Sequence, residues 1–128
     1  MTQEDKELIF KELCARLPYH VKCKICLKDG STEEGLLDLQ HNYGNVLQDA
    51  FYYNKIKDIK PYLRPMSSMT EEEKEEYCQL QQKVIYNSKG VINEDVTKYI
   101  NWCYKKHLDI NNLIPMELAI DATGLNIY

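Results

Sequence analysis

The residues of this chain with the clearest chemical potential are its cysteines and histidines. They are Cys14, Cys23, Cys26, Cys78 and Cys103, together with His20, His41 and His107. Cys23-x-x-Cys26 and Cys103-x-x-x-His107 have the spacing of two zinc half-sites. However, the alternating hydrophobicity around the first pair would turn its two thiols to opposite faces of a strand. The pattern therefore favours structural, reduced cysteines that hold no metal and no other cofactor.

Nucleophilic catalysis needs a cysteine or serine with a positioned base. The histidines could approach a cysteine in space, but the sequence contains no nucleophile elbow, no Gly-x-Gly-x-x-Gly and no P-loop. The carboxylates gather in Glu71–Glu76, where a solvated helix start explains them. We therefore expect no catalytic residues and a protein that is not an enzyme.

The charge of the chain bounds its partners. Among 128 residues, 16 are basic and 20 are acidic, which gives a net charge of -4 and argues against a general nucleic-acid binder. The charge is uneven: residues 16–64 carry eight basic and six acidic residues, and residues 65–128 carry six and ten. The middle of the chain can therefore hold a local basic patch. The ten tyrosines suit half-buried positions and interfaces.

The first half of the chain predicts one helix and a small sheet. Thr2 can cap a helix that ends at about Leu17, before Pro18. Alternation then predicts a strand at Val21–Leu27 with a basic outer face, a turn at Asp29-Gly30 and a second strand at 35–40. We expect further strand material at 46–47 and 50–53 and a short turn at 56–59. Three or four antiparallel strands would form a curled sheet or an SH3-like barrel.

The second half predicts helices. Pro61 and Pro65 bracket a segment that should lie across a surface rather than continue the sheet. Thr70 and Glu73 predict a capping box and a helix to about residue 86, and Asn93 can cap the next helix. A short final helix is expected at 116–122. The fold class is therefore α+β, in one compact unit with a helix and sheet over residues 1–66 and a helical subdomain over 67–128.

A binding surface is predicted around the proline-bracketed segment. Basic and aromatic residues alternate there, and the residues that we expect to contact a partner are Tyr52, Tyr53, Lys57, Lys60, Tyr62 and Arg64. Tyrosine and arginine are enriched at interface hot spots, and the lysines can steer an acidic partner. Alternatively, these residues, with Phe51 and Lys55, bind nucleic acid through a sheet face. A third interpretation is that the aromatics pack the sheet, with Tyr62 and Leu63 anchoring the segment to the core.

No apolar run approaches the roughly 20 residues that a membrane helix needs, and no apolar segment follows a basic start. The sequence therefore predicts a protein without a membrane interaction, located in the cytoplasm. Oligomeric state leaves no mark on the sequence.

Three runs resemble a known family. They are Leu-Cys-Ala-Arg-Leu-Pro-Tyr at 13–19, Ile-Lys-Pro-Tyr-Leu-Arg-Pro-Met-Ser-Ser-Met-Thr-Glu-Glu-Glu at 59–73, and Leu-Ile-Pro-Met-Glu-Leu-Ala at 113–119. They resemble a family of small uncharacterised proteins common in Bacteroides-type bacteria and in their phages and prophages. The resemblance supplies no catalytic or ligand residues. It implies a mobile-element protein in a bacterial host cell, whose partner is a host protein or ribonucleoprotein complex. An anti-defence inhibitor of a CRISPR effector is an example.

Overall fold

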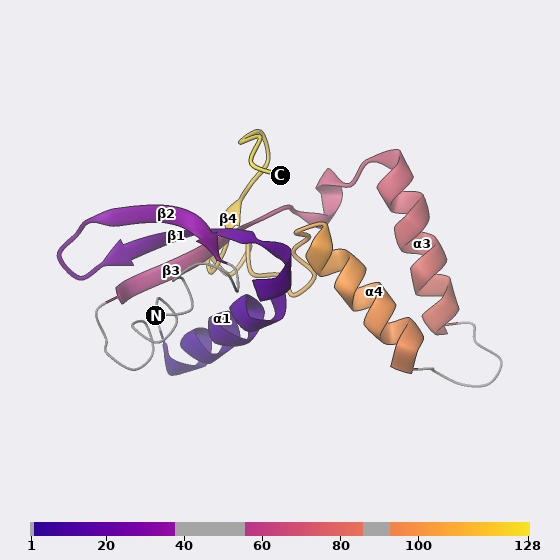
Figure 1. Ribbon diagram of the computed structural model, residues 1–128, viewed down its shortest axis with the longest axis horizontal. Coiled ribbons are helices and arrows are strands. Elements are labelled where there is room, and N and C mark those ends of the chain that lie inside the picture. The colour runs from indigo at the N-terminus through magenta and orange to yellow at the C-terminus, as the bar shows by residue number, and fades with distance from the viewer. Residues whose placement is uncertain (1, 38–55, 86–92) are drawn as a thin grey trace.

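Figure 1 shows a computed structural model of the chain, which describes residues 2–37, 56–85 and 93–128. The fold is α+β. Its elements in chain order are α1 (Gln3–Arg16), β1 (Val21–Leu27), β2 (Thr32–Leu37), β3 (Ile56–Leu63), α3 (Glu71–Ile85), α4 (Asn93–Lys105) and β4 (Ile120–Asp121), with 3-10 turns at Leu17–Tyr19 and Met66–Ser68. The expected strand material at 46–47 and 50–53, and the expected end of the second strand, lie outside the described residues.

The start of α1 confirms its predicted cap. The Asp5 N–H donates to Thr2 Oγ1 over 3.1 Å, and the Thr2 N–H donates to the Asp5 carboxylate over 3.2 Å. This reciprocal capping box satisfies two of the N–H groups that a helix start leaves free. The helix buries Ile9 and Leu13 against the sheet and ends at Arg16, close to its predicted end.

The described strands form one sheet in the order β2-β1-β3-β4. The alternation in β1 is confirmed, because Val21, Cys23 and Ile25 are buried while Lys22 and Lys24 are half-buried on the other face. The turn after β1 is also where it was expected, and Gly30 has a left-handed φ of 90°. β1 pairs antiparallel with β2 and β3, but β3 pairs parallel with β4. The expectation of a wholly antiparallel sheet was therefore wrong. These four strands lie in a linear order rather than closing a barrel.

The segment around Pro61 was also predicted wrongly. Residues 56–59 belong to β3 instead of a turn, and Pro61 lies within this strand, opposite Cys23. Proline can occupy a strand where one edge needs no donor. In the described part of the sheet, β4 first pairs with β3 at Tyr62, so at Pro61 this edge has no strand beside it.

The residues after α4 return to the core rather than forming a final helix. The buried Asp109 carboxylate accepts the N–H groups of Leu113 (2.8 Å) and Ile114 (2.9 Å) and so holds a series of turns. Glu117 then adopts a left-handed φ of 61°, which interrupts any helix, and β4 follows at Ile120. The predicted helix at 116–122 was therefore wrong.

α3 and α4 form a hairpin that projects from the sheet in Figure 1. Its start confirms the predicted capping box: the Glu73 N–H donates to Thr70 Oγ1 over 3.2 Å, and the Thr70 N–H donates to the Glu73 carboxylate over 3.0 Å. Tyr77 of α3 meets Tyr99 of α4, with the hydroxyl oxygens 2.9 Å apart. No described helix is both long and apolar enough to cross a membrane.

One core joins the first and second halves of the chain. Leu113, Leu118 and Ala119 pack in the same buried cluster as the residues of α1 and the sheet. A buried polar network also crosses between the halves. Arg16 is fully buried; its Nε donates to the Glu12 carboxylate and its Nη2 donates to the Leu108 carbonyl, each over 2.8 Å. A separate helical subdomain starting at residue 67 stays a prediction, but its last residues share this core.

Candidate binding surface

The structure separates the residues that were predicted to bind a partner. Lys57 and Lys60 lie together on β3 beside a hollow, whereas Tyr62 is buried and Arg64 is held by other side chains. Tyr52 and Tyr53 lie outside the described residues. The described candidates therefore reduce to Lys57 and Lys60 as residues that a partner can reach.

A break in the register between β1 and β3 sets the position of Lys57. Cys26 pairs with Asp58, but the next residue of β1, Leu27, pairs with Ile56. Lys57 is thus an extra residue on β3, which is the arrangement of a β-bulge. Bulges turn side chains out of the regular alternation and recur beside functional sites. Lys57 is exposed as a result, although the flanking strand is half-buried.

The hollow beside this bulge, here called the bulge hollow, has a volume of about 300 Å³. It is lined by Lys57, Asp58, Lys60, Met116, Glu117 and Leu118. The first three come from β3, and the last three come from the turns that Asp109 holds. Met116 is 48% exposed, and Glu117 is the left-handed residue of these turns. Two backbone irregularities, far apart in sequence, therefore border the same hollow.

Charge in the bulge hollow is mixed. The Lys60 ammonium lies 3.8 Å from Asp58 Oδ2. Asp58 Oδ1 is buried and has no hydrogen-bond partner among the described residues. A buried carboxylate oxygen without a donor is unfavourable, so the fold keeps Asp58 here at a cost in stability. The hollow offers two ammonium groups and a flexible thioether to a ligand.

Tyr62 is buried rather than accessible to a partner. Its side chain is 7% exposed, and its hydroxyl donates to the Glu34 carboxylate over 2.6 Å. Burial, followed by this bond to Glu34, raises the pKa of the Tyr62 hydroxyl to about 12. The neighbouring Leu63 is fully buried. Leu63 packs in the central cluster and anchors β3 to the core, as the third interpretation of the sequence proposed, whereas the Tyr62 side chain lies on the other face of β3 and is tied to β2 through Glu34.

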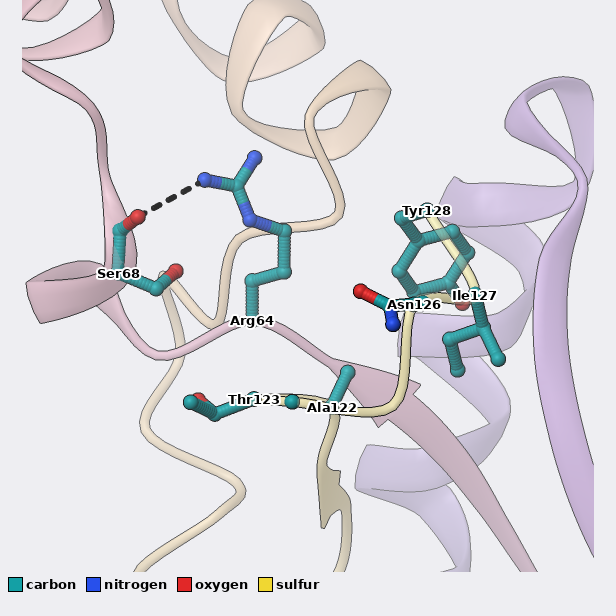
Figure 2. A pocket seen from close by; sticks show the side chains of 8 residues that line it. Arg64, Ser68, Ala122, Thr123, Asn126, Ile127 and Tyr128 are labelled. Carbon is teal, nitrogen blue, oxygen red and sulfur yellow. Dashed lines mark hydrogen bonds between the residues drawn. The ribbon is translucent and has the colours of Figure 1, made fainter.

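Arg64 joins β3 to the start of α3. Its two terminal nitrogens donate to the Glu73 carboxylate over 2.9 and 2.7 Å, and one also donates to the Ser68 carbonyl over 3.1 Å. Figure 2 shows the guanidinium turned toward Ser68, with Asn126 and Tyr128 lying across a second hollow of about 200 Å³. Because its guanidinium already donates to Glu73 and to the Ser68 carbonyl, Arg64 is a structural residue here rather than an accessible hot spot.

The Arg64–Glu73 pair predicts an acid-dependent loss of stability. The hydrogen bonds from Arg64 lower the pKa of the Glu73 carboxyl from 4.5 to about 2. A carboxyl whose pKa falls on folding stabilises the protein above its unfolded pKa. That stability, about 3 kcal/mol for this shift, disappears as the pH falls from about 4.5 to about 2. Urea unfolding should therefore show that Glu73→Gln destabilises the protein at pH 7 and much less at pH 2.5. The exposed Glu75→Gln is the control, and a Glu73→Gln effect equal at both pH values would contradict the assignment.

The buried thiols are poor nucleophiles. Burial raises the pKa of Cys23 to about 12 and of Cys103 to about 11, so both remain protonated at neutral pH. Cys26 lies on the opposite face of β1 from Cys23. Within the described segments, no three cysteine, histidine or acidic side chains are grouped to hold a metal ion.

His107 packs against the C-terminal Tyr128. Its ring stacks on Tyr128, with the ring centroids 3.7 Å apart. Burial, with the nearby Arg16 and Arg64 charges, lowers the pKa of the His107 imidazole to about 4, so the ring is neutral at pH 7. The Tyr128 hydroxyl in turn accepts the Lys22 N–H and donates to the Tyr62 carbonyl, each over 2.8 Å, and so bridges β1 and β3.

Sequence reasoning missed the second wall of the bulge hollow. Residues 116–118 were assigned to a helix, and Asp58 to a turn. The one local signal was Asp109, a residue type that caps nearby N–H groups.

No protein-family model, curated protein or solved structure matches this chain. The geometry of the bulge hollow therefore carries the functional argument.

Proposed function

We propose that this protein is a non-enzymatic binding protein that recognises a partner macromolecule through the bulge hollow. The observation that carries the proposal is the meeting of a β-bulge at Lys57 and a left-handed Glu117 at one hollow. Irregular backbone is unfavourable for stability and gathers where a site must be shaped. The turns that contain Glu117 are fixed by the buried Asp109, so the hollow is largely formed before a partner arrives.

The side chains of the bulge hollow support binding rather than catalysis. Its ionisable groups are two lysines and two carboxylates, and Asp58 is already next to Lys60. A hollow with these groups supplies charge and shape complementarity. The buried thiols, which are the strongest potential nucleophiles, lie on core positions and remain protonated.

The partner that we propose is a component of a bacterial macromolecular machine, either a host protein or a ribonucleoprotein complex. The support for this context is the resemblance to small phage and prophage proteins. In that setting, the protein would modulate the machine, for example as an anti-defence inhibitor. Direct nucleic-acid binding is the alternative, favoured by the lysines on the outer face of β1 and β3.

A capture experiment tests the proposal. The purified protein is incubated with bacterial host lysate, with and without nuclease, and the captured proteins are identified. We expect Lys57→Glu with Lys60→Glu to lower the affinity for the captured partner more than tenfold, because the double change reverses both ammonium charges without altering the core. Binding of the purified partner is measured by titration calorimetry.

The matched control is Lys83→Glu with Lys105→Glu, which makes the same charge change at two exposed positions of α3 and α4 that do not line the hollow. Both variants should retain the wild-type circular dichroism spectrum. Equal affinities for the two double variants would place the binding surface elsewhere. Loss of all captured material on nuclease treatment, with direct binding to nucleic acid, would favour the alternative.

A further inference from the structure

We infer that the bulge hollow, extended by Lys24, accepts an extended acidic segment of a protein partner with an apolar residue beside its carboxylates. This inference rests on the proposed function and names the chemistry of the partner. Its evidence is a second feature of the sheet, namely two lysines that face each other across β1 and β3.

Lys24 of β1 lies directly opposite Lys60 of β3, and both are half-buried on the outer face. Opposite residues in an antiparallel pair have Cβ atoms roughly 4.5–5.5 Å apart, so like charges there repel. Glu34 of β2 is paired with Lys24 in the other direction, but its carboxylate accepts the Tyr62 hydroxyl and lies 3.9 Å from Lys22. Among the described residues, Lys24 therefore has no ion-pair partner.

An anionic ligand would remove this repulsion. The bulge adds the Lys57 ammonium near the same edge. Three ammonium groups, of which Lys60 is already paired with Asp58, therefore follow one another across two strands: Lys24, Lys60 and Lys57. In an extended peptide, alternate side chains point the same way and repeat at roughly 6.6 Å. Two acidic residues at alternate positions of a partner segment can therefore meet this row of lysines.

The other wall of the hollow requires an apolar group. Met116 is 48% exposed, and Leu118 lies beside it in the lining. Methionine adapts its shape to apolar ligands, which suits a surface that receives one side chain. A volume of about 300 Å³ is at the lower end of ligand pockets, which span roughly 300–1,000 Å³. It fits one or two side chains.

A protein segment fits this surface better than a nucleic acid does. Exposed Glu34 of β2 is the cross-strand neighbour of Lys24, and Glu117 lines the hollow with Lys57 and Lys60. Charges are largely unscreened over about 8–10 Å at ordinary salt, so carboxylates beside the lysines would repel a continuous row of phosphates. A partner with two carboxylates and an apolar residue avoids much of that repulsion.

A peptide selection tests the inference with a defined probe. A displayed library of random 12-residue peptides is selected on the full-length protein and counter-selected on Lys57→Glu with Lys60→Glu. We expect an enriched pattern with two acidic residues near one large apolar residue. Fluorescence polarisation of one selected peptide should show at least threefold weaker binding to each of Lys24→Met, Lys57→Met and Met116→Ala. Lys105→Met, at an exposed position of α4, is the unaffected control.

Lys24→Met provides a second readout. Because it removes the repulsion with Lys60, it should raise the urea midpoint while weakening peptide binding, a combination that a purely structural lysine would not give.

Failure to enrich any peptide, a pattern without acidic residues, or a 20-nucleotide single strand binding through Lys24 and Lys57 would overturn the inference. If a lysate partner needs Lys57 and Lys60 but not Lys24, the acidic-segment inference falls and the proposed function stands. If no partner is captured at all, the proposed function itself fails.

Discussion

Arg16→Met is expected to lower the free energy of unfolding by about 3–5 kcal/mol, the usual loss when one member of a buried ion pair is removed. Arg16 is fully buried: Glu12 accepts its Nε–H, the Leu108 carbonyl accepts an N–H of its Nη2, and its guanidinium carbon lies 4.7 Å from the centroid of the Tyr104 ring. Without Arg16, the Glu12 carboxylate, itself 2% exposed, keeps the hydrogen bond from Asn111 as its one side-chain partner among the residues that the structure describes. Chemical denaturation measures the change.

The matched control for Arg16 is Lys11→Met, which removes one positive charge from an exposed position of the same helix. Its effect should stay within about 0.5 kcal/mol. Adding Glu12→Gln to Arg16→Met should recover part of the lost stability, because the uncompensated buried charge is then absent. An Arg16→Met variant as stable as Lys11→Met would contradict the network.

Leu63→Ala is expected to destabilise the protein by about 2–5 kcal/mol, as other large-to-small changes in cores do. Leu63 is fully buried in the central cluster. Its carbonyl also accepts the Ala122 N–H over 2.9 Å, so Leu63 links β3 to the C-terminal residues after β4. Thermal and urea unfolding give the difference. Leu125→Ala, at a position that is 48% exposed, makes the same chemical change and should be nearly neutral.

The same Leu63 variant tests the anchoring role of β3. We expect it to bind the captured partner with wild-type affinity under conditions in which it stays folded, because Leu63 faces the core and Lys57 faces the hollow. A large loss of binding with little loss of stability would instead assign Leu63 to the partner surface.

The elements that the sequence predicted well carry local signals. Thr2 and Thr70 begin helices because each is followed three residues later by a carboxylate that completes a capping box. β1 shows its period over seven residues, Val21–Leu27. The missed elements depend on distant partners. Pro61 is tolerated in β3 by the position of β4, and β4 itself is two residues long and pairs parallel to β3.

The candidate site was predicted in part for the same reason. The composition around residues 57–64 located Lys57 and Lys60, but could not distinguish them from Tyr62 and Arg64. Tyr62 is buried and bonded to the distant Glu34, and Arg64 is paired with Glu73. Met116 reaches the hollow only because the chain returns to the sheet after α4, and no local pattern encodes that return.

The cysteine distribution gives this protein built-in reporters of its own local opening. Cys23 lies in β1 and Cys103 in α4, and they are 2% and 0% exposed, whereas Cys14 and Cys78 are exposed on α1 and α3. Regions of a folded protein open with different free energies, and a buried thiol reacts with a modifying reagent only during an opening. With Cys14, Cys26 and Cys78 replaced by serine, the modification rates of the remaining two thiols would time the opening of the sheet and of the helical hairpin separately. A bound partner that closes over the sheet would then be visible as a slower rate at Cys23 alone.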